Sequence, residues 1–412
     1  MASTTPFSRI PQPMIGMNWE PSPSDYTSLP APAKYGDTDF ANDDFVALWN
    51  VDGNGVGRHD LTVIKNMSCN TIKMYNWSVP APNGYWMRNH GNFLQLAGTL
   101  GLSVIVPISN YFTGMAYNQR TSSAANPGGL NPGGPMYSPA VNLQQWMLDI
   151  VTEIYRSGSP GAAIIWAIGN EYDNDNLGTY GYCEAQDIAQ IASYIVDAEV
   201  SLNISADNVL AFTSPVTTAL IPVNSSIPSS DPTYNALMGG CAIEALLQAF
   251  GAAPGGAALA SRFMASVNSY QIGQQLTDYY NQFPTVFPNL NFFYGELGFS
   301  ASYGAATQAA NVQSQFANVV GTATAGSCFY GACCFEYTDE LWKGPTGSSE
   351  TMFGLFTFTG TPQTSTEGDH APVWSASYPV DNLNPRPAMQ SFVFAVNPSS
   401  VLLPPPPLLP AA

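Results

Sequence analysis

Residues 163–171 read Ala-Ile-Ile-Trp-Ala-Ile-Gly-Asn-Glu, an apolar run that ends in a glycine, an amide and a carboxylate. A near-continuous apolar run is typical of a strand buried on both faces, as in a parallel sheet. A carboxylate has little reason to follow such a run unless the strand end opens onto a site. Residues 291–298, Asn-Phe-Phe-Tyr-Gly-Glu-Leu-Gly, repeat the pattern, so Glu171 and Glu296 are paired candidates at two strand ends.

Apolar runs of strand character recur along the chain, separated by stretches of helical or loop character. Residues 144–156, 182–202 and 307–320 place apolar side chains at helical spacing. Eight strands alternating with helices over about 250 residues or more predict an α/β fold, a (β/α)8 TIM barrel. An open doubly wound sheet is the alternative, but no G-x-G-x-x-G follows the first strand. The predicted strands are 14–19, 71–77, 102–110, 163–172, 209–216, 263–270, 291–299 and 328–337.

Three long connections, 21–39, 112–139 and 215–234, are rich in Gly, Pro, Asn and Ser. In a barrel we expect them on the carboxyl-terminal face, where such loops shape a substrate groove; disordered ornament is the alternative. The chain ends in a proline-rich stretch that favours extended polyproline II. The predicted organisation is an N-terminal segment 1–11, a single catalytic barrel domain 12–396 and a Pro-rich tail 397–412.

The composition is strongly acidic, with 29 Asp or Glu against 11 Lys or Arg and a formal net charge of -18. Such a surface repels phosphate backbones and anionic lipid, so we expect no nucleic-acid partner. No apolar run is long enough to predict a membrane span. A neutral polysaccharide or oligosaccharide fits better, and 8 Trp, 21 Tyr and 21 Phe offer stacking surfaces for sugar rings, although most must fill the core. The sequence carries no signal for the oligomeric state.

Two features favour an extracellular or cell-surface location. The six cysteines lack zinc-ligand spacing, and their even number permits disulfide bonds. Four sequons, at Asn66, Asn76, Asn203 and Asn224, predict a glycoprotein. The N-terminus nevertheless shows no apolar segment of a signal peptide. An intracellular protein with six thiols is the alternative.

Two carboxylates at the carboxyl ends of parallel strands are what cleavage of a glycosidic bond requires. Asn170, beside Glu171, can hydrogen-bond a sugar 2-hydroxyl, a contact that strengthens in the transition state. The bland alternatives are that Asn170 caps the next helix and that the glycines around Glu296 simply make a turn. We expect no metal and no cofactor, because the three histidines are scattered. Serine-hydrolase chemistry lacks its G-x-S-x-G motif.

The two motifs together resemble the clan A retaining glycoside hydrolases, which carry Gly-Asn-Glu after strand four and a Glu after strand seven. Residues 72–75, Ile-Lys-Met-Tyr, resemble the Ile-Arg-x-Tyr of strand two in glycoside hydrolase families 17 and 72. Residues 335–343, Phe-Glu-Tyr-Thr-Asp-Glu-Leu-Trp-Lys, resemble strand eight of microbial family 17, as does Phe-Gly-Leu-Phe at 353–356. Residues 14–21 are more similar to the first strand of family 72. Family 17 contains β-1,3-glucanases, and family 72 contains β-1,3-glucanosyltransferases.

The sequence departs from these families at two places. Lys73 stands where these families usually have Arg. An ammonium cannot make the bidentate hydrogen bonds that a guanidinium makes to a carboxylate. Gly-Glu-Leu-Gly-Phe-Ser at 295–300 replaces the commoner Gly-Glu-Thr-Gly-Trp-Pro. Both catalytic carboxylates of the pattern are intact.

The resemblance implies a retaining glycoside hydrolase or transglycosylase that cleaves β-glucan, most often β-1,3 links, by double displacement. Glu171 is then the acid/base, Glu296 the nucleophile and Asn170 the partner of the 2-hydroxyl. Tyr270 would orient Glu296, or it fills the core. The remaining implied contacts are Tyr75, Lys73 and Asn18 with the sugar, Trp342 by stacking or as core, and Glu336 with Asp339 and Lys343 shaping the cleft or forming an ion-pair network. The alternative function is a catalytically silent glycan-binding or structural surface protein on the same barrel.

Overall fold

The computed structural model describes residues 6–25, 39–78, 89–121, 142–174, 183–217, 239–345, 347–366 and 377–399, without the side chains of 239–241. Each of the eight predicted runs contains a strand of one parallel sheet. The strands are β1 Met14–Asn18, β2 Thr71–Lys73, β3 Ser103–Ile108, β4 Ala163–Ile168, β5 Ala211–Thr213, β6 Pro215–Thr217, β7 Ala265–Ser269, β8 Phe292–Leu297 and β9 Phe329–Cys334.

The sheet closes into a barrel through a strand that is split in two. Its order is β5-β4-β3-β2-β1-β9-β8-β7-β6, so the sheet begins and ends on neighbouring stretches of the chain. β5 pairs with β4, β6 pairs with β7, and only Ser214 lies between the halves. A parallel bridge between Phe212 and Phe263 adds a further link across the closure. Nine strands therefore fill the eight positions of a TIM barrel, and the predicted fold class is confirmed.

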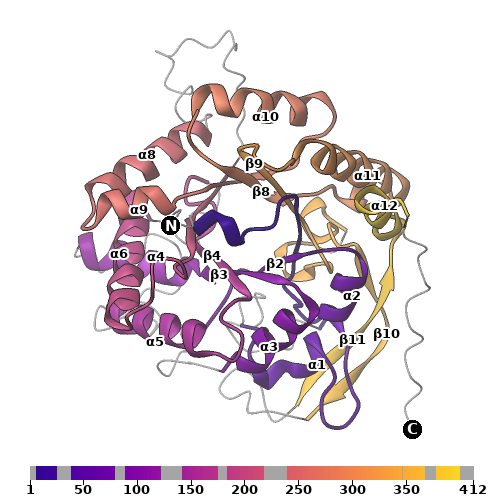
Figure 1. Ribbon diagram of the computed structural model, residues 1–412. Coiled ribbons are helices and arrows are strands. Elements are labelled where there is room, and N and C mark those ends of the chain that lie inside the picture. The colour runs from indigo at the N-terminus through magenta and orange to yellow at the C-terminus, as the bar shows by residue number, and fades with distance from the viewer. Residues whose placement is uncertain are drawn as a thin grey trace.

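Helices surround the barrel, as Figure 1 shows. The three helices predicted from apolar spacing are present as α5, α6 and α11. On α5 the predicted face is buried, including Trp146 and Ile150. The helices are α1 Val46–Trp49, α2 Asp60–Asn66, α3 Gly91–Leu100, α4 Asn110–Thr121, α5 Leu143–Arg156, α6 Ala185–Ser201, α8 Gly239–Ala252, α9 Gly256–Arg262, α10 Gln274–Val286, α11 Ala305–Thr322 and α12 Pro387–Val396.

Both faces of the barrel strands are buried, which explains their continuous apolar sequences. On β3, Ile105 belongs to the cluster inside the barrel, whereas Val104 and Val106 belong to the layer between sheet and helices. The short 3-10 helix Pro6–Arg9 lies at the amino ends of the strands, where Phe7 packs against the inner cluster. Arg9 donates to the carbonyl of Ala163 at 3.0 Å. The segment before β1 thus packs on the barrel.

Two of the predicted long loops are partly regular structure. Residues 112–121 continue α4, because Phe112 and Met115 are apolar and buried there. Residues 215–217 form β6. The predicted loops were wrong for these two stretches. Residues 26–38, 122–139 and 218–234, and the tail from 400 onward, lie outside the described residues.

An antiparallel hairpin that the sequence reading missed follows the last barrel strand. It consists of β10 Phe356–Ser365 and β11 Tyr378–Pro385 and lies beside α1 and α2 in Figure 1. Tyr378 accepts a hydrogen bond from the backbone of Ala47 at 3.1 Å and packs edge-on against Phe45. The hairpin thus ties the end of the domain to its beginning.

The expected disulfide bonds are absent among the five cysteines whose side chains are described. These are Cys69, Cys183, Cys328, Cys333 and Cys334, all free thiols. Of the sequons, Asn66 and Asn203 are exposed, Asn76 is buried, and Asn224 lies outside the described residues. No described helix is long and apolar enough to cross a membrane.

Candidate active site

A cavity of about 620 Å³ opens at the carboxyl ends of the barrel strands, and both predicted carboxylates line it. Its other walls come from Lys73 and Tyr75 on and after β2, and from Asn268 on β7. A second cavity, of about 430 Å³, lies at the amino ends of the strands beside Arg9, and no carboxylate lines it. The paired acidic groups therefore select the first cavity as the site.

Glu296 lies inside β8, one residue before the strand ends and within the predicted strand 291–299. Its carboxylate accepts hydrogen bonds from the hydroxyls of Tyr75, at 2.7 Å, and Tyr270, at 2.6 Å. The ammonium of Lys73 lies 3.5 Å away. Burial opposes ionisation, but the charges of Lys73 and Lys343 and the two hydroxyl donors outweigh it and lower the pKa of Glu296. Glu296 is therefore an ionised carboxylate held by four donors or cations.

Glu171 sits on a strained turn after β4. Gly169 and Glu171 both have left-handed backbone conformations, with φ of 66° and 53°. Such a conformation is costly for a residue with a side chain and persists only when its surroundings enforce it. The Glu171 amide donates to the carbonyl of Pro215 at 2.8 Å, and the Asn170 amide donates to Asn110 Oδ1 at 2.8 Å. These two bonds hold the turn and aim Glu171 into the cavity.

The environment of the Glu171 carboxyl group differs from that of Glu296. Its oxygens accept from the amides of Asn268, at 2.8 Å, and Asn174, at 3.0 Å. Burial first, and then the negative charge of Glu296, raise the pKa of Glu171 to about 7. One cavity thus holds a carboxylate that stays ionised and a carboxyl group that stays protonated up to neutral pH.

Two asparagines that the sequence reading missed organise the acid side of the site. Asn268 Nδ2 donates both to Glu171 and, at 3.2 Å, to Asn170 Oδ1. Asn110 bonds both the amide and the carbonyl of Asn170. The sequence held only a weak signal, an amide in a predicted strand that also contains Ser266 and Ser269. In the structure Asn268 is only 2% exposed.

The other predicted contacts divide into two groups. Trp342 and Asn170 line the cavity, as do the partners of Glu296. The Trp342 Nε1 is buried and has no hydrogen-bond partner among the described residues. Asn18 and Glu336 are buried and do not line the cavity. Asn18 instead donates at 3.0 Å to the carbonyl of Gly295, which precedes Glu296 on β8.

The glycines around Glu296 serve close packing and not a turn. Neither Gly295 nor Gly298 has a left-handed backbone. A Cβ on Gly298 would lie 2.0 Å from the carbonyl oxygen of Phe335. A Cβ on Gly295 would lie 2.3 Å from Ser266 Oγ. Glycine thus lets the neighbouring segments approach closely on either side of Glu296.

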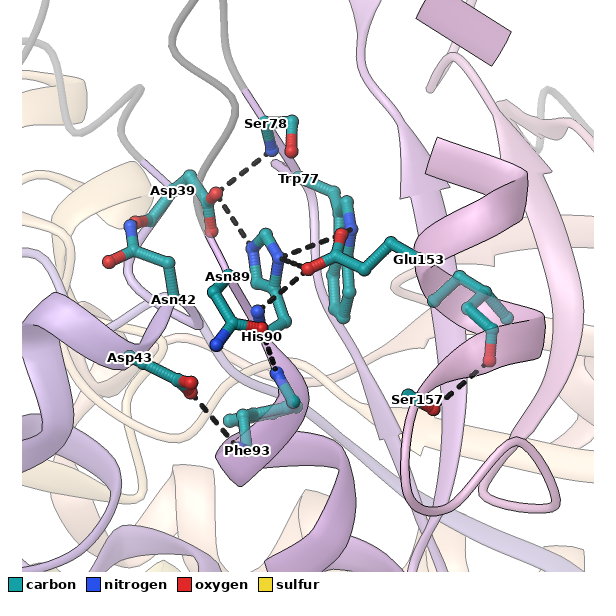
Figure 2. A network of polar contacts seen from close by, with 12 residues as sticks. Asp39, Asn42, Asp43, Trp77, Ser78, Asn89, His90, Phe93, Glu153 and Ser157 are labelled. Carbon is teal, nitrogen blue, oxygen red and sulfur yellow. Dashed lines mark hydrogen bonds and ion pairs between the residues drawn. The ribbon is translucent and has the colours of Figure 1, made fainter. Parts of the chain in front are cut away.

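A buried ionic network centred on His90 joins distant segments of the chain (Figure 2). His90 Nε2 pairs with Asp39 at 2.8 Å and Nδ1 with Glu153 at 2.9 Å, while the ring stacks on Trp77 with centroids 3.7 Å apart. Ser78 donates its amide to Asp39 at 2.9 Å. Burial opposes protonation, yet the two carboxylates raise the pKa of His90 to about 10. The network joins the chain after β1, the end of the β2 segment, α3 and α5.

Metal ligands do not cluster among the described residues: no group of three His, Cys, Asp or Glu side chains there could hold a metal ion.

Solved structures with a similar fold are glycoside hydrolases. A GH5_18 protein from Streptomyces cattleya, in complex with GlcNAc, superposes with a TM-score of 0.52 at 12% identity, covering 94% of this chain and 80% of that one. CJP38, a β-1,3-glucanase and allergen of Cryptomeria japonica pollen, gives 0.49 at 13% identity over 84% and 95%. An endo-laminarinase from Formosa Hel1_33_131 gives 0.46 at 15% identity over 86% and 84%. The sequence matches no family model and no curated protein.

Identities this low show a shared fold and nothing finer. The barrel that the sequence resemblance implied is confirmed by the strand order and by the superposition on the GH5_18 protein.

Proposed function

We propose that this protein is a retaining glycoside hydrolase or transglycosylase that cleaves β-glucan, most often at β-1,3 links. One observation carries the proposal: the two carboxyl groups of a single cavity have pKa values shifted in opposite directions. The pKa of Glu296 is lowered, and the pKa of Glu171 is raised to about 7. Pairs of carboxyl groups pushed apart in this way divide the roles of acid and nucleophile. The β-1,3 preference rests on the resemblance of residues 72–75 and 335–343 to family 17.

The reaction is a double displacement. Glu296 attacks the anomeric carbon, and the bond to the leaving oxygen breaks as Glu171 gives that oxygen its proton. Glu171, now a carboxylate, takes a proton from water or from a sugar hydroxyl. The resulting oxygen nucleophile displaces Glu296 from the anomeric carbon and restores both groups. Water gives hydrolysis, and a second sugar gives transfer.

The surrounding side chains have supporting roles. Tyr75 and Tyr270 orient the two oxygens of Glu296 through their hydroxyls. Asn170 is the partner of the sugar 2-hydroxyl, with its side chain placed by Asn268. Trp342, which lines the cavity, stacks on a sugar ring. We further propose an extracellular or cell-surface location, where such a polymer would be met.

The pH profile follows from the two titrations. Glu171 must be protonated to act as the acid, and its pKa is raised to about 7. The rate kcat/KM should therefore be highest on the acidic side of neutrality and fall tenfold per pH unit above about 7. A Glu171→Gln variant should lose this alkaline limb on a substrate whose leaving group needs no proton, such as an aryl glycoside. A profile that stays flat to pH 9 in the wild type would remove Glu171 as the acid.

Product analysis tests the function directly. The wild type and a Glu296→Gln variant are incubated with β-1,3-gluco-oligosaccharides, and the products are read by mass spectrometry. Shorter oligomers alone mean hydrolysis, and products longer than the substrate mean transfer. The variant should retain almost no activity. A wild-type protein that leaves β-1,3, β-1,4 and β-1,6 glucans intact would contradict the proposed enzymatic activity. It would favour the alternative, a catalytically silent glycan-binding protein.

A further inference from the structure

A second charged cluster lies beside Glu296, on the segment after β9. Lys343 is the last residue of the 3-10 helix Leu341–Lys343, and it lines the cavity together with Glu340 and Glu296. It forms an ion pair with Glu340, whose side chain is 1% exposed, and lies 4.6 Å from the centroid of the Phe335 ring. Lys343 therefore reaches the cavity with one carboxylate already bound to it.

The charges of this cluster depend on one another. Burial and the neighbouring charge of Glu340 raise the pKa of Glu336 well above its usual range, so Glu336 is protonated and donates to Glu340. Glu340 is then the anionic partner of Lys343. Although burial disfavours its charge, the carboxylates of Glu340 and Glu296 raise the pKa of Lys343. The Lys343 ammonium thus lies in the same cavity as Glu296, and its charge lowers the pKa of that carboxyl group.

The backbone of the segment is fixed independently of this cluster. Asp339 accepts two bonds of 2.6 Å from the guanidinium of Arg386, at the start of α12. Arg386 also donates to the carbonyl of Gly354 at 2.6 Å, and the Gly354 amide donates to Asp339 at 3.1 Å. The segment is thus held by its own ion pair. A lysine side chain is long and flexible, so its ammonium needs a further partner to keep one position.

We propose that Glu340 is a positioning residue that holds the Lys343 ammonium in place as a fixed counter-charge to Glu296. The inference rests on the proposed function, in which Glu296 is the nucleophile. The other titratable groups that face Glu296 are Lys73 and Tyr75 from β2, Tyr270 after β7, Glu171 after β4 and Cys333 on β9. Of these only Lys73 is a second cation. Without Lys343, the ammonium of Lys73 would be the one remaining cation among these groups.

The test is the acidic limb of the pH profile of kcat/KM on β-1,3-gluco-oligosaccharides, which reports ionisation of the nucleophile in the free enzyme. Lys343→Met should move this limb upward by about one pH unit, because an opposite charge is lost. Glu340→Gln should move it in the same direction, since the ammonium loses its anchor. The double variant should shift no further than Lys343→Met. Lys343→Arg, which keeps the charge, should restore most of the wild-type profile.

The direction in which Glu340→Gln moves the acidic limb decides whether Glu340 positions the Lys343 ammonium. A downward shift would mean that Glu340 acts on Glu296 only as a nearby negative charge, and it would overturn the inference. So would an unchanged limb in Lys343→Met. Glu244→Gln, an exposed position on α8, is the matched control for loss of one carboxylate and should leave the profile unchanged.

Thermal unfolding by circular dichroism identifies variants that fail to fold. If Glu340→Gln does not fold, Glu340→Asp replaces it: this variant keeps the carboxylate but shortens its reach to Lys343, so it should move the limb upward, and an unmoved limb would overturn the inference. The two proposals also fail differently. An inactive wild type removes the proposed function and this inference with it, whereas an active wild type with an unmoved limb removes this inference alone.

Discussion

Glu171 occupies a left-handed backbone conformation and a partly buried, negatively charged environment, both of which cost stability. The structure enforces this through the bonds of its amide to Pro215 and of its carboxyl group to Asn268 and Asn174. Destabilising arrangements of this kind concentrate at functional sites. At the scale of the residue, the backbone conformation and the environment of Glu171 therefore lower the free energy of unfolding of the protein.

A Glu171→Gln variant should therefore be more stable than the wild type, and more so at alkaline pH. The pKa of Glu171 is raised from 4.5 to about 7, so the carboxyl group destabilises the fold above its unfolded pKa, and the full cost is present above pH 7. That cost is about 3 kcal/mol. Urea unfolding at pH 4.5 and pH 8 measures it. A stability gain that is equal at both pH values would contradict the assignment.

At the scale of the element, the sequence predicted what depends on continuous burial. The eight barrel strands and the helices α5, α6 and α11 followed from apolar runs and apolar spacing. The split of the fifth strand at Ser214 could not be predicted, because a break in the hydrogen bonding between strands does not change the hydrophobicity of the sequence. The hairpin of β10 and β11 was missed because its side chains are half exposed and many are Thr, Asn or Pro.

Site residues were predictable where a family motif carries them. Glu171 and Glu296 stood out as charges at the ends of apolar runs. Asn268 did not, because its role appears only when β7 is placed beside β8 and across from the β4 turn. Asp39, His90 and Glu153 are far apart in the chain, and only the fold brings their charges together (Figure 2).

His90→Asn should destabilise the protein by about 3–5 kcal/mol at pH 6.5, since it leaves Asp39 and Glu153 buried without their cation. The pKa of His90 is raised from 6.5 to about 10, so its contribution is complete below pH 6.5 and is lost as pH rises to 10. Wild type and variant should converge in unfolding free energy by pH 10. His59→Asn, at an exposed position with φ of 56°, is the control and should change little. A constant gap between His90→Asn and the wild type across this range would mean that His90 acts only by packing.

At the scale of the whole molecule, an acidic chain surrounds an acidic cavity. The formal net charge is -18. The cavity is lined by five carboxyl groups, Glu20, Glu171, Glu296, Glu340 and Glu350, and by two ammonium groups, Lys73 and Lys343. A field of one sign over a cleft repels ligands of the same sign. Under the proposed function, this charge favours neutral glycans over anionic ones.

Carboxymethylated β-1,3-glucan should be a poorer substrate than the neutral polymer, by roughly tenfold in kcat/KM at low ionic strength. Added salt should narrow the gap, because the Debye length shrinks to about 8 Å at 0.15 M. The neutral polymer is the internal control, and its kcat/KM should change little with salt. Equal rates on both polymers at low salt would show that the charge of the cavity does not select substrate.

The central claim is that Glu296 forms a covalent bond to the substrate. An activated 2-deoxy-2-fluoro-β-glucosyl or laminaribiosyl donor slows breakdown of such an intermediate, and peptide mass spectrometry then locates the adduct. We predict one sugar on the peptide that contains Glu296, with no adduct in Glu296→Gln. Labelling at another residue, or hydrolysis with an inverted anomeric product and no adduct, would contradict this account.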